Sequence, residues 1–143
     1  MATTITVDAL LDRVQAMAPM LRAYSAEAEA QRRLPRPVVD AMCQAELYSM
    51  AHPQAFGGLE VDPLTMFRVV EDVAYHDSAA GWNMQMSVGA SCFLAWLPDE
   101  GAAEILTSHP TPIVAGTLFP GRQAIPVDGG YRLRAVALRD RQP

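Results

Sequence analysis

Asp72 and His76 are the residues whose types and spacing come nearest to a catalytic pair, and Asp77 follows them directly. They lie four positions apart in a segment with helical periodicity, which places their side chains on one helix face. A carboxylate that orients an imidazole is an arrangement used by general bases. Because no nucleophile is placed nearby in the sequence, we favour the simpler interpretation of a surface pair that supports the helix.

Metal and phosphate sites have weaker signals. His52 and His109 each precede a proline in predicted loops, and no spacing of His, Cys or Glu resembles a metal site. The pairs Gly57-Gly58 and Gly129-Gly130 fit neither GxGxxG nor GxxxxGK[ST]. Tight turns explain both pairs. We therefore expect no metal site and no phosphate loop.

The segment 78–82, Ser-Ala-Ala-Gly-Trp, combines small residues with an aromatic one at a predicted helix start. Small residues let another backbone or a flat ligand approach closely. Trp82 could then stack on a ring or donate its indole N–H. From residue type alone, a core position for Trp82 is favoured over a ligand contact. Met84 and Met86 in the same segment are also more typical of a core.

The amino-acid composition limits the kinds of binding partner and the cellular compartment that we expect for this protein. Eleven Lys and Arg against sixteen Asp and Glu give a net charge of −5, which disfavours nucleic-acid binding. Two cysteines far apart, Cys43 and Cys92, do not make a disulfide framework. Residues 1–8 lack a signal-peptide pattern, and the most apolar stretch, 92–97, is too short to span a membrane. We expect a cytoplasmic protein without nucleic-acid, membrane or metal partners.

Helical patterns fill the first part of the chain. Apolar residues recur at helical spacing over 10–21, Asp8 can cap that helix, and the pattern extends to Arg33. Two prolines in 35–37 break it, and a short helix follows over 38–46. These patterns predict a helical domain.

Two further helix starts are strongly marked. Asp62-Pro63 combines a capping residue with proline at the first helical position, and Asp77-Ser78 ends that helix and caps the next. The segment 79–97 is apolar nearly all round, which predicts a helix buried in a core or in an oligomer. Pro98 then opens a last short helix. One face of the helix after Asp62 is predicted to be formed by Leu64, Phe67, Val70 and Ala74.

The residue pattern changes from helical to β-rich after residue 112. Residues 113–119 are β-rich, 124–127 form a second predicted strand, and Asp128-Gly129-Gly130 is a hairpin signal. We therefore divide the chain into a helical domain, 1–112, and the start of a β-domain, 113–143. Two or three strands are marginal alone, so we expect that β-domain to be incomplete.

Several segments, in order and spacing, resemble the acyl-CoA dehydrogenase superfamily, and most closely its branch of flavin-dependent two-component monooxygenases. The resemblance extends from about Leu21 to Leu133. It is carried by AEAQRRLP (28–35), VVDAM (38–42), PQAFGGLE (53–60), SAAGW (78–82), LPDE (97–100) and PVDGGY (126–131).

The resemblance implies a mainly α fold: the helical N-terminal domain of that superfamily, followed by the first strands of its central β-domain. In the family a C-terminal four-helix bundle follows, and FAD or FMN lies between the last two domains, usually in a homotetramer. The reaction is then acyl-CoA dehydrogenation or hydroxylation of an aromatic or steroid-like substrate. The resemblance implies that this chain alone does not bind the flavin stably.

The chain departs from the family after the hairpin. The family continues with a Gly-x-Trp-x-[FW]-x-Ser-Gly strand that contacts the flavin, whereas this sequence has RAVALRDRQP at 134–143. No catalytic residue can be carried over. Trp82 matches a position that approaches the cofactor in the monooxygenase-like branch, and Leu118 and Phe119 match a nearby strand end less well. We expect a truncated flavoprotein of the oxidoreductase class that is inactive in isolation.

Two other functions stay open. The chain could be an oligomerisation or interaction module that uses an exposed helix 79–97. It could also be one half of a split flavoenzyme whose remainder is a partner chain. A clean monomer in light scattering would count against the first. A neighbouring reading frame that begins with the missing strand would support the second.

Overall fold

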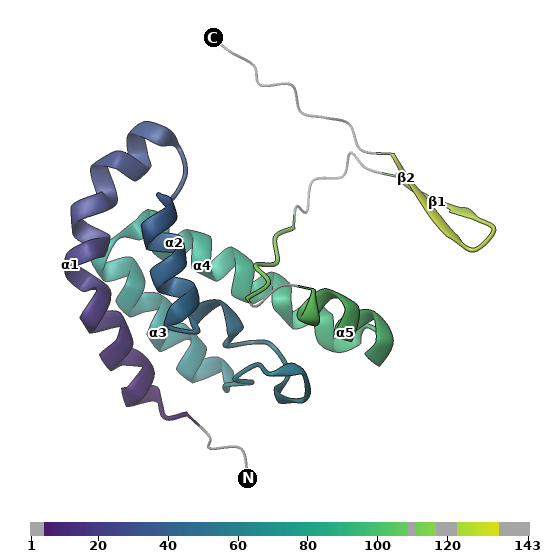
Figure 1. Ribbon diagram of the computed structural model, residues 1–143, viewed down its shortest axis with the longest axis horizontal. Helices are drawn as coiled ribbons and strands as arrows, with labels where there is room; N and C mark the ends of the chain where they lie inside the picture. The colour runs from purple at the N-terminus through teal and green to yellow at the C-terminus, as the bar shows by residue number, and fades with distance from the viewer. Residues whose placement is uncertain (1–4, 109–110, 117–122, 135–143) are drawn as a thin grey trace.

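The computed structural model describes residues 5–108, 111–116 and 123–134, and its fold is mainly helical, as predicted (Figure 1). Long helices come first, and an antiparallel hairpin follows. The elements are α1 (Val7–Gln31), α2 (Arg36–Gln44), η1 (Leu47–Ser49), η2 (Gln54–Phe56), α3 (Pro63–His76), α4 (Ser78–Ser91), η3 (Cys92–Trp96), α5 (Asp99–Thr107), β1 (Gln123–Val127) and β2 (Gly130–Arg134). Leu118 and Phe119 lie outside the described residues.

The first helix begins two residues earlier than predicted. Thr6, not Asp8, is the N-cap of α1, and its hydroxyl accepts from the Ala9 amide at 3.2 Å. Asp8 lies inside the first turn, where its charge suits the helix dipole but its side chain is past the capping position. α1 ends at Gln31, and the next residue, Arg32, closes the helix with a left-handed φ of 53°.

Asp77 joins α3 to α4, as the sequence predicts. Its amide donates to the Val73 carbonyl at 3.0 Å and ends α3, while its carboxylate accepts from the Ala80 amide at 2.7 Å and begins α4. The residue is extended, with φ −154°, so the chain turns sharply between the two helices. The helices come so close that a Cβ on Gly81 would lie 2.5 Å from the Ala74 Cβ.

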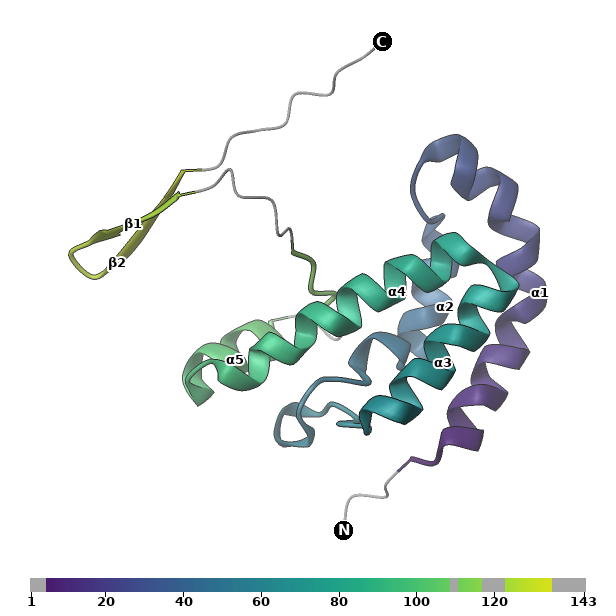
Figure 2. The same cartoon turned by 180° about the vertical axis from the view of Figure 1, so that it is seen from behind.

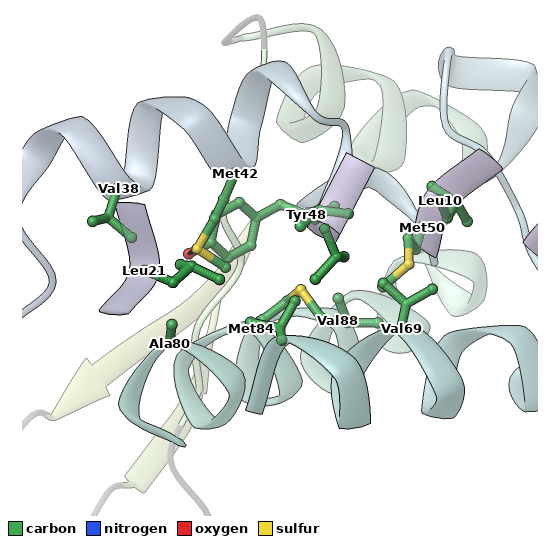
Figure 3. Close-up of a cluster of buried hydrophobic side chains, with 13 residues drawn as sticks. Leu10, Leu21, Val38, Met42, Tyr48, Met50, Val69, Ala80, Met84 and Val88 are labelled. Atoms are coloured by element: carbon green, nitrogen blue, oxygen red, sulfur yellow. Dashed lines mark hydrogen bonds between the residues drawn. The ribbon is translucent and has the colours of Figure 1, made fainter. Parts of the chain in front are cut away.

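The core lies where α1, α2, η1, α3 and α4 meet (Figure 3). α1 and α3 run side by side (Figure 2). Val38 and Met42 of α2 approach α4 from the other side. The buried cluster consists of Leu10, Val14, Leu21, Val38, Met42, Leu47, Tyr48, Met50, Val69, Val73, Ala80, Met84 and Val88.

The predicted apolar face of α3 is only partly buried, since Val70 packs against the core. Val69 and Val73 are its buried residues, whereas Leu64 and Phe67 are well exposed. Because apolar residues occur on both sides of this helix, their periodicity alone does not say which side packs. The N-terminal part of α3 exposes its apolar residues Leu64 and Phe67.

The prediction of one helix over 79–97 is wrong at its C-terminal end, and so is its burial on all sides in the core of this chain, whereas burial in an oligomer stays a prediction. α4 ends at Ser91, and a 3₁₀ segment, η3, follows. Only one side of α4 is buried, through Ala80, Met84 and Val88, while Trp82 on the other side is 68% exposed. The outer side lacks charged residues and forms an exposed, largely apolar surface that also carries the polar residues Asn83 and Gln85.

The hairpin forms where the sequence predicts it. β1 and β2 pair antiparallel, with Pro126 opposite Tyr131 and Val127 opposite Gly130. Gly129, with φ 78°, occupies the turn. Residues 113–116, predicted as the start of a strand, are not in a strand in the structure. Over the described residues, no helix has the length and apolar character needed to cross a membrane.

The close approach of α3 and α4 gives a stability test. Gly81→Ala is expected to lower the free energy of unfolding by about 1–3 kcal/mol, because the new methyl group meets Ala74 and forces the helices apart. Gly89→Ala, in the same helix with nothing within 4 Å, is expected to raise it by roughly 0.5–1 kcal/mol. Urea denaturation measures both. Equal effects of the two substitutions would show that helix propensity, not the contact, decides.

Candidate functional site

The outer side of α4 is the surface with the clearest signs of a binding role. Trp82 and Met86 lie one turn apart on it, and Phe93 and Trp96 of η3 are exposed further along, Trp96 to 86%. No charged residue occurs from Ser78 to Leu97. Exposed apolar surface without charge is typical of sites that bind a ligand or another protein surface. The core position favoured for Trp82 from residue type is wrong.

Asn83 is the polar residue beside Trp82, and a buried tyrosine holds it. The Tyr48 side chain is 0% exposed, and its hydroxyl donates to Asn83 Oδ1 at 2.7 Å. Burial raises the pKa of the Tyr48 phenol, so the hydroxyl keeps its proton and remains a donor. Sequence reasoning missed this pair because the two residues lie 35 positions apart.

The Asp72–His76 pair belongs to a polar network between α1 and α3. The amide nitrogen of Gln15 donates to both Asp72 carboxylate oxygens at 2.9 Å, and Arg22 Nη2 lies 2.9 Å from His76 Nδ1. His76 Nε2 is 3.7 Å from Asp72 Oδ1, too far for a hydrogen bond. The carboxylate therefore does not orient the imidazole as a base needs.

The structural interpretation of this pair holds, with one correction. The His76 side chain is only 3% exposed, so the pair is not simply on the surface. It lies between two helices, and its polar atoms are used by α1 residues. The physical reason is that α1 covers the face of α3 that carries His76.

His52 and Ser91 make a second contact that resembles a catalytic pair. His52 Nε2 lies 3.1 Å from Ser91 Oγ, but the Ser91 hydroxyl already donates to the Ser87 carbonyl at 2.8 Å. The imidazole must therefore be the donor in this contact. An activated serine needs the opposite arrangement, with the imidazole accepting the hydroxyl proton. Both side chains are buried, so the pair fastens the loop after His52 onto α4.

The described residues offer few other candidates for metal binding or catalysis. Within the described ranges, no group of three or more His, Cys, Asp or Glu could hold a metal ion. Cys43 and Cys92 are free, and burial raises the pKa of the Cys43 thiol, which disfavours the reactive thiolate. The predicted contacts at Leu118 and Phe119 cannot be placed, since both lie outside the described residues.

Two open hollows lie away from Trp82. One of about 570 Å³ lies between the end of α1 and the start of α2, and one of about 490 Å³ lies between α2, the end of α5 and residues 111–114. Neither is lined by α4. The outer side of α4 exposes Trp82 and Met86 as an open wall, and such a wall binds weakly unless another surface covers the ligand.

Comparison with known proteins gives a consistent picture. Residues 6–109 match the family model described as acyl-CoA dehydrogenase, N-terminal domain. The chain is 35% identical to indole-3-acetate monooxygenase of Pseudomonas putida over 88% of this chain and 31% of that protein. It is 26% identical to the oxygenase component of the FADH(2)-dependent resorcinol hydroxylase of Rhizobium sp. (strain MTP-10005), over 87% of this chain and 30% of that protein.

Solved structures agree in fold. XiaF from Streptomyces sp., in complex with FADH2 and glycerol, superposes with a TM-score of 0.84 at 28% identity, covering 89% of this chain and 32% of that one. The HsaA monooxygenase from M. tuberculosis has the same TM-score at 24% identity, and the match covers 90% of this chain and 34% of that one. This likeness shows a shared fold. The chain thus spans about a third of the length of the relatives it matches.

His52 gives a pH test. Burial lowers its pKa below the ordinary value, so the unfolded chain binds a proton before the folded one does. Its contribution to stability is intact above about pH 6.5 and is lost as the pH falls below that value, at no more than about 1.4 kcal/mol per pH unit. His52→Gln, which keeps an N–H donor for Ser91, should lose less stability on acidification in urea denaturation. Identical pH dependence in both proteins would contradict this assignment.

Proposed function

This chain belongs to the acyl-CoA dehydrogenase family, whose N-terminal domain it contains, and from that premise we propose that it serves flavin-dependent hydroxylation of an aromatic compound. The single observation that carries the proposal is Trp82, which stands 68% exposed on an uncharged helix face. The relatives named above support this branch, because they are named as monooxygenases or hydroxylases.

Trp82 fits a flavin or an aromatic substrate for a simple reason. A flat ring can stack on an exposed indole, and the absence of charge along Ser78–Leu97 lets the ring lose water without stranding an ion. FAD or FMN, when bound, supplies the oxygen chemistry of the reaction. The part of this chain is to provide one apolar wall, to exclude water from it and to orient the ring.

Among the residues that the structure describes, we assign no general base to this wall. The carboxylate nearest to Trp82 in sequence, Asp77, is buried and committed to the Ala80 amide. We therefore assign no catalytic residue to this chain. We place the acid–base chemistry in the part of the matched relatives that this chain does not cover, which is about two thirds of their length. We further propose a division at residue 112, supported by the end of α5 at Thr107 and the start of β1 at Gln123.

A second candidate is an interaction module, favoured by the exposure of Phe93 and Trp96 next to Trp82. Such a surface could pair two copies of this chain or receive a partner chain that supplies the rest of a flavoenzyme. Light scattering over a range of concentrations tests self-association, and a constant monomer mass would rule it out. We also propose a cytoplasmic location, which the free thiols of Cys43 and Cys92 support.

The two tryptophans give a test of flavin docking. In Trp96→Phe, which leaves Trp82 as the sole tryptophan, FMN is expected to quench the fluorescence in a saturable way, because the ring stacks on the indole. In Trp82→Phe, the remaining Trp96 is the more exposed residue, so it reports collisional quenching alone.

Stronger quenching of Trp96 than of Trp82 would contradict docking at α4. The chain mixed with reduced FMN and resorcinol is expected to form no hydroxylated product, since it carries no assigned acid or base. Clear turnover by the chain alone would overturn the assignment of a wall without catalytic residues.

A further inference from the structure

The hydrogen bond from Tyr48 to Asn83 links a fully buried side chain to an exposed one. Its length of 2.7 Å is typical of O–H···O and short for a bond that involves an amide nitrogen. The Asn83 oxygen therefore faces the tyrosine, and the amide NH₂ faces away from it. Met42 Sδ, at 3.7 Å, is the other group near the hydroxyl.

This orientation leaves two N–H donors on the outer side of α4. In the part of the chain that the structure describes, Asn83 has Tyr48 as its hydrogen-bond partner and the NH₂ group has no acceptor. Asn83 lies next to Trp82 in sequence and one turn before Met86, so the three side chains adjoin on the helix. It is thus an uncharged donor at the edge of an apolar surface.

We propose that Asn83 is a specificity-determining residue, whose amide donates to a ring-bound oxygen of the planar ligand that stacks on Trp82. The inference rests on the proposed function and goes beyond it by naming the ligand chemistry: a flat ring with a carbonyl or phenolic oxygen. A flavin ring and a phenolic substrate both have such an oxygen.

A hydrogen-bond donor is needed here because the surface around Trp82 is apolar. An apolar surface holds a flat ring but does not fix its rotation, whereas one placed polar group does. A donor already fixed by a buried hydroxyl loses little conformational freedom when the ligand binds. Because an amide carries no charge, it also costs less to desolvate than an ion would.

The test compares Asn83→Asp with Gln85→Glu in the full chain. Asn83→Asp keeps an oxygen for the Tyr48 hydroxyl but replaces the donor with an acceptor. Gln85→Glu makes the same chemical change at another exposed position of α4. Binding of FMN, resorcinol and indole is followed through the Trp82 indole N–H signal by NMR, which detects weak complexes.

Asn83→Asp is expected to weaken binding of FMN, of resorcinol or of both by roughly 2- to 10-fold relative to Gln85→Glu. The probe that loses affinity identifies the source of the oxygen. Binding of indole, which has no acceptor oxygen, should not weaken. Tyr48→Phe should reduce affinity for the same probe, because it frees the amide to rotate.

Two results would overturn the inference. If at least one of the two probes binds at Trp82 and neither FMN nor resorcinol loses affinity in Asn83→Asp relative to Gln85→Glu, Asn83 has no role and the proposed function survives. If neither probe shifts the Trp82 signal in the unaltered chain, the proposed function and the inference both fail. Circular dichroism of each variant confirms that the helices are intact.

Discussion

The buried carboxylate of Asp77 is the constraint on which the arrangement of the later helices depends. A carboxylate with 8% exposure is costly unless its oxygens are bonded, and the start of α4 supplies the donor. The same residue fixes the phase of α4. Since each residue advances by about 100° around the axis, turning Ala80 and Met84 into the core turns Trp82 and Met86 outward. The exposed apolar surface of α4 is thus a geometric consequence of where α4 begins.

Polar contacts between distant segments complete this arrangement. His76 is bonded to α1, His52 to α4, and Asn83 to η1 through Tyr48. Two of the three resemble catalytic groups in residue type alone. Donor and acceptor assignments show that the His52 and His76 imidazoles are used within the fold, whereas Asn83 keeps donors directed outward. The distinction between a structural and a binding role lies in which atoms remain unused.

Local sequence signals predicted much of the fold, whereas features that depend on contacts between distant segments could not be predicted. The starts of α3 and α4 could be predicted because Asp62 and Asp77 bond to amides within three residues. The inner face of α3 could not, because Leu64 and Phe67 are as apolar as Val69 and Val73, and only packing against α1 decides between them. At the site, Trp82 was identified from family resemblance, but its exposure and its neighbour Asn83 depend on tertiary contacts that spacing does not encode.

The register of the hairpin has a consequence for how a larger sheet is assembled. A two-residue turn makes Val127 and Gly130 the hydrogen-bonded pair that closes it, so the next pair, Pro126 and Tyr131, points its backbone nitrogens outward. Proline has no N–H, and the free edge of β1 therefore lacks a donor at that position. The free edge of β2 keeps its donor at Tyr131. The outer edge of β2 therefore suits pairing with a further strand better than that of β1, where proline removes one donor and is typical of an edge strand.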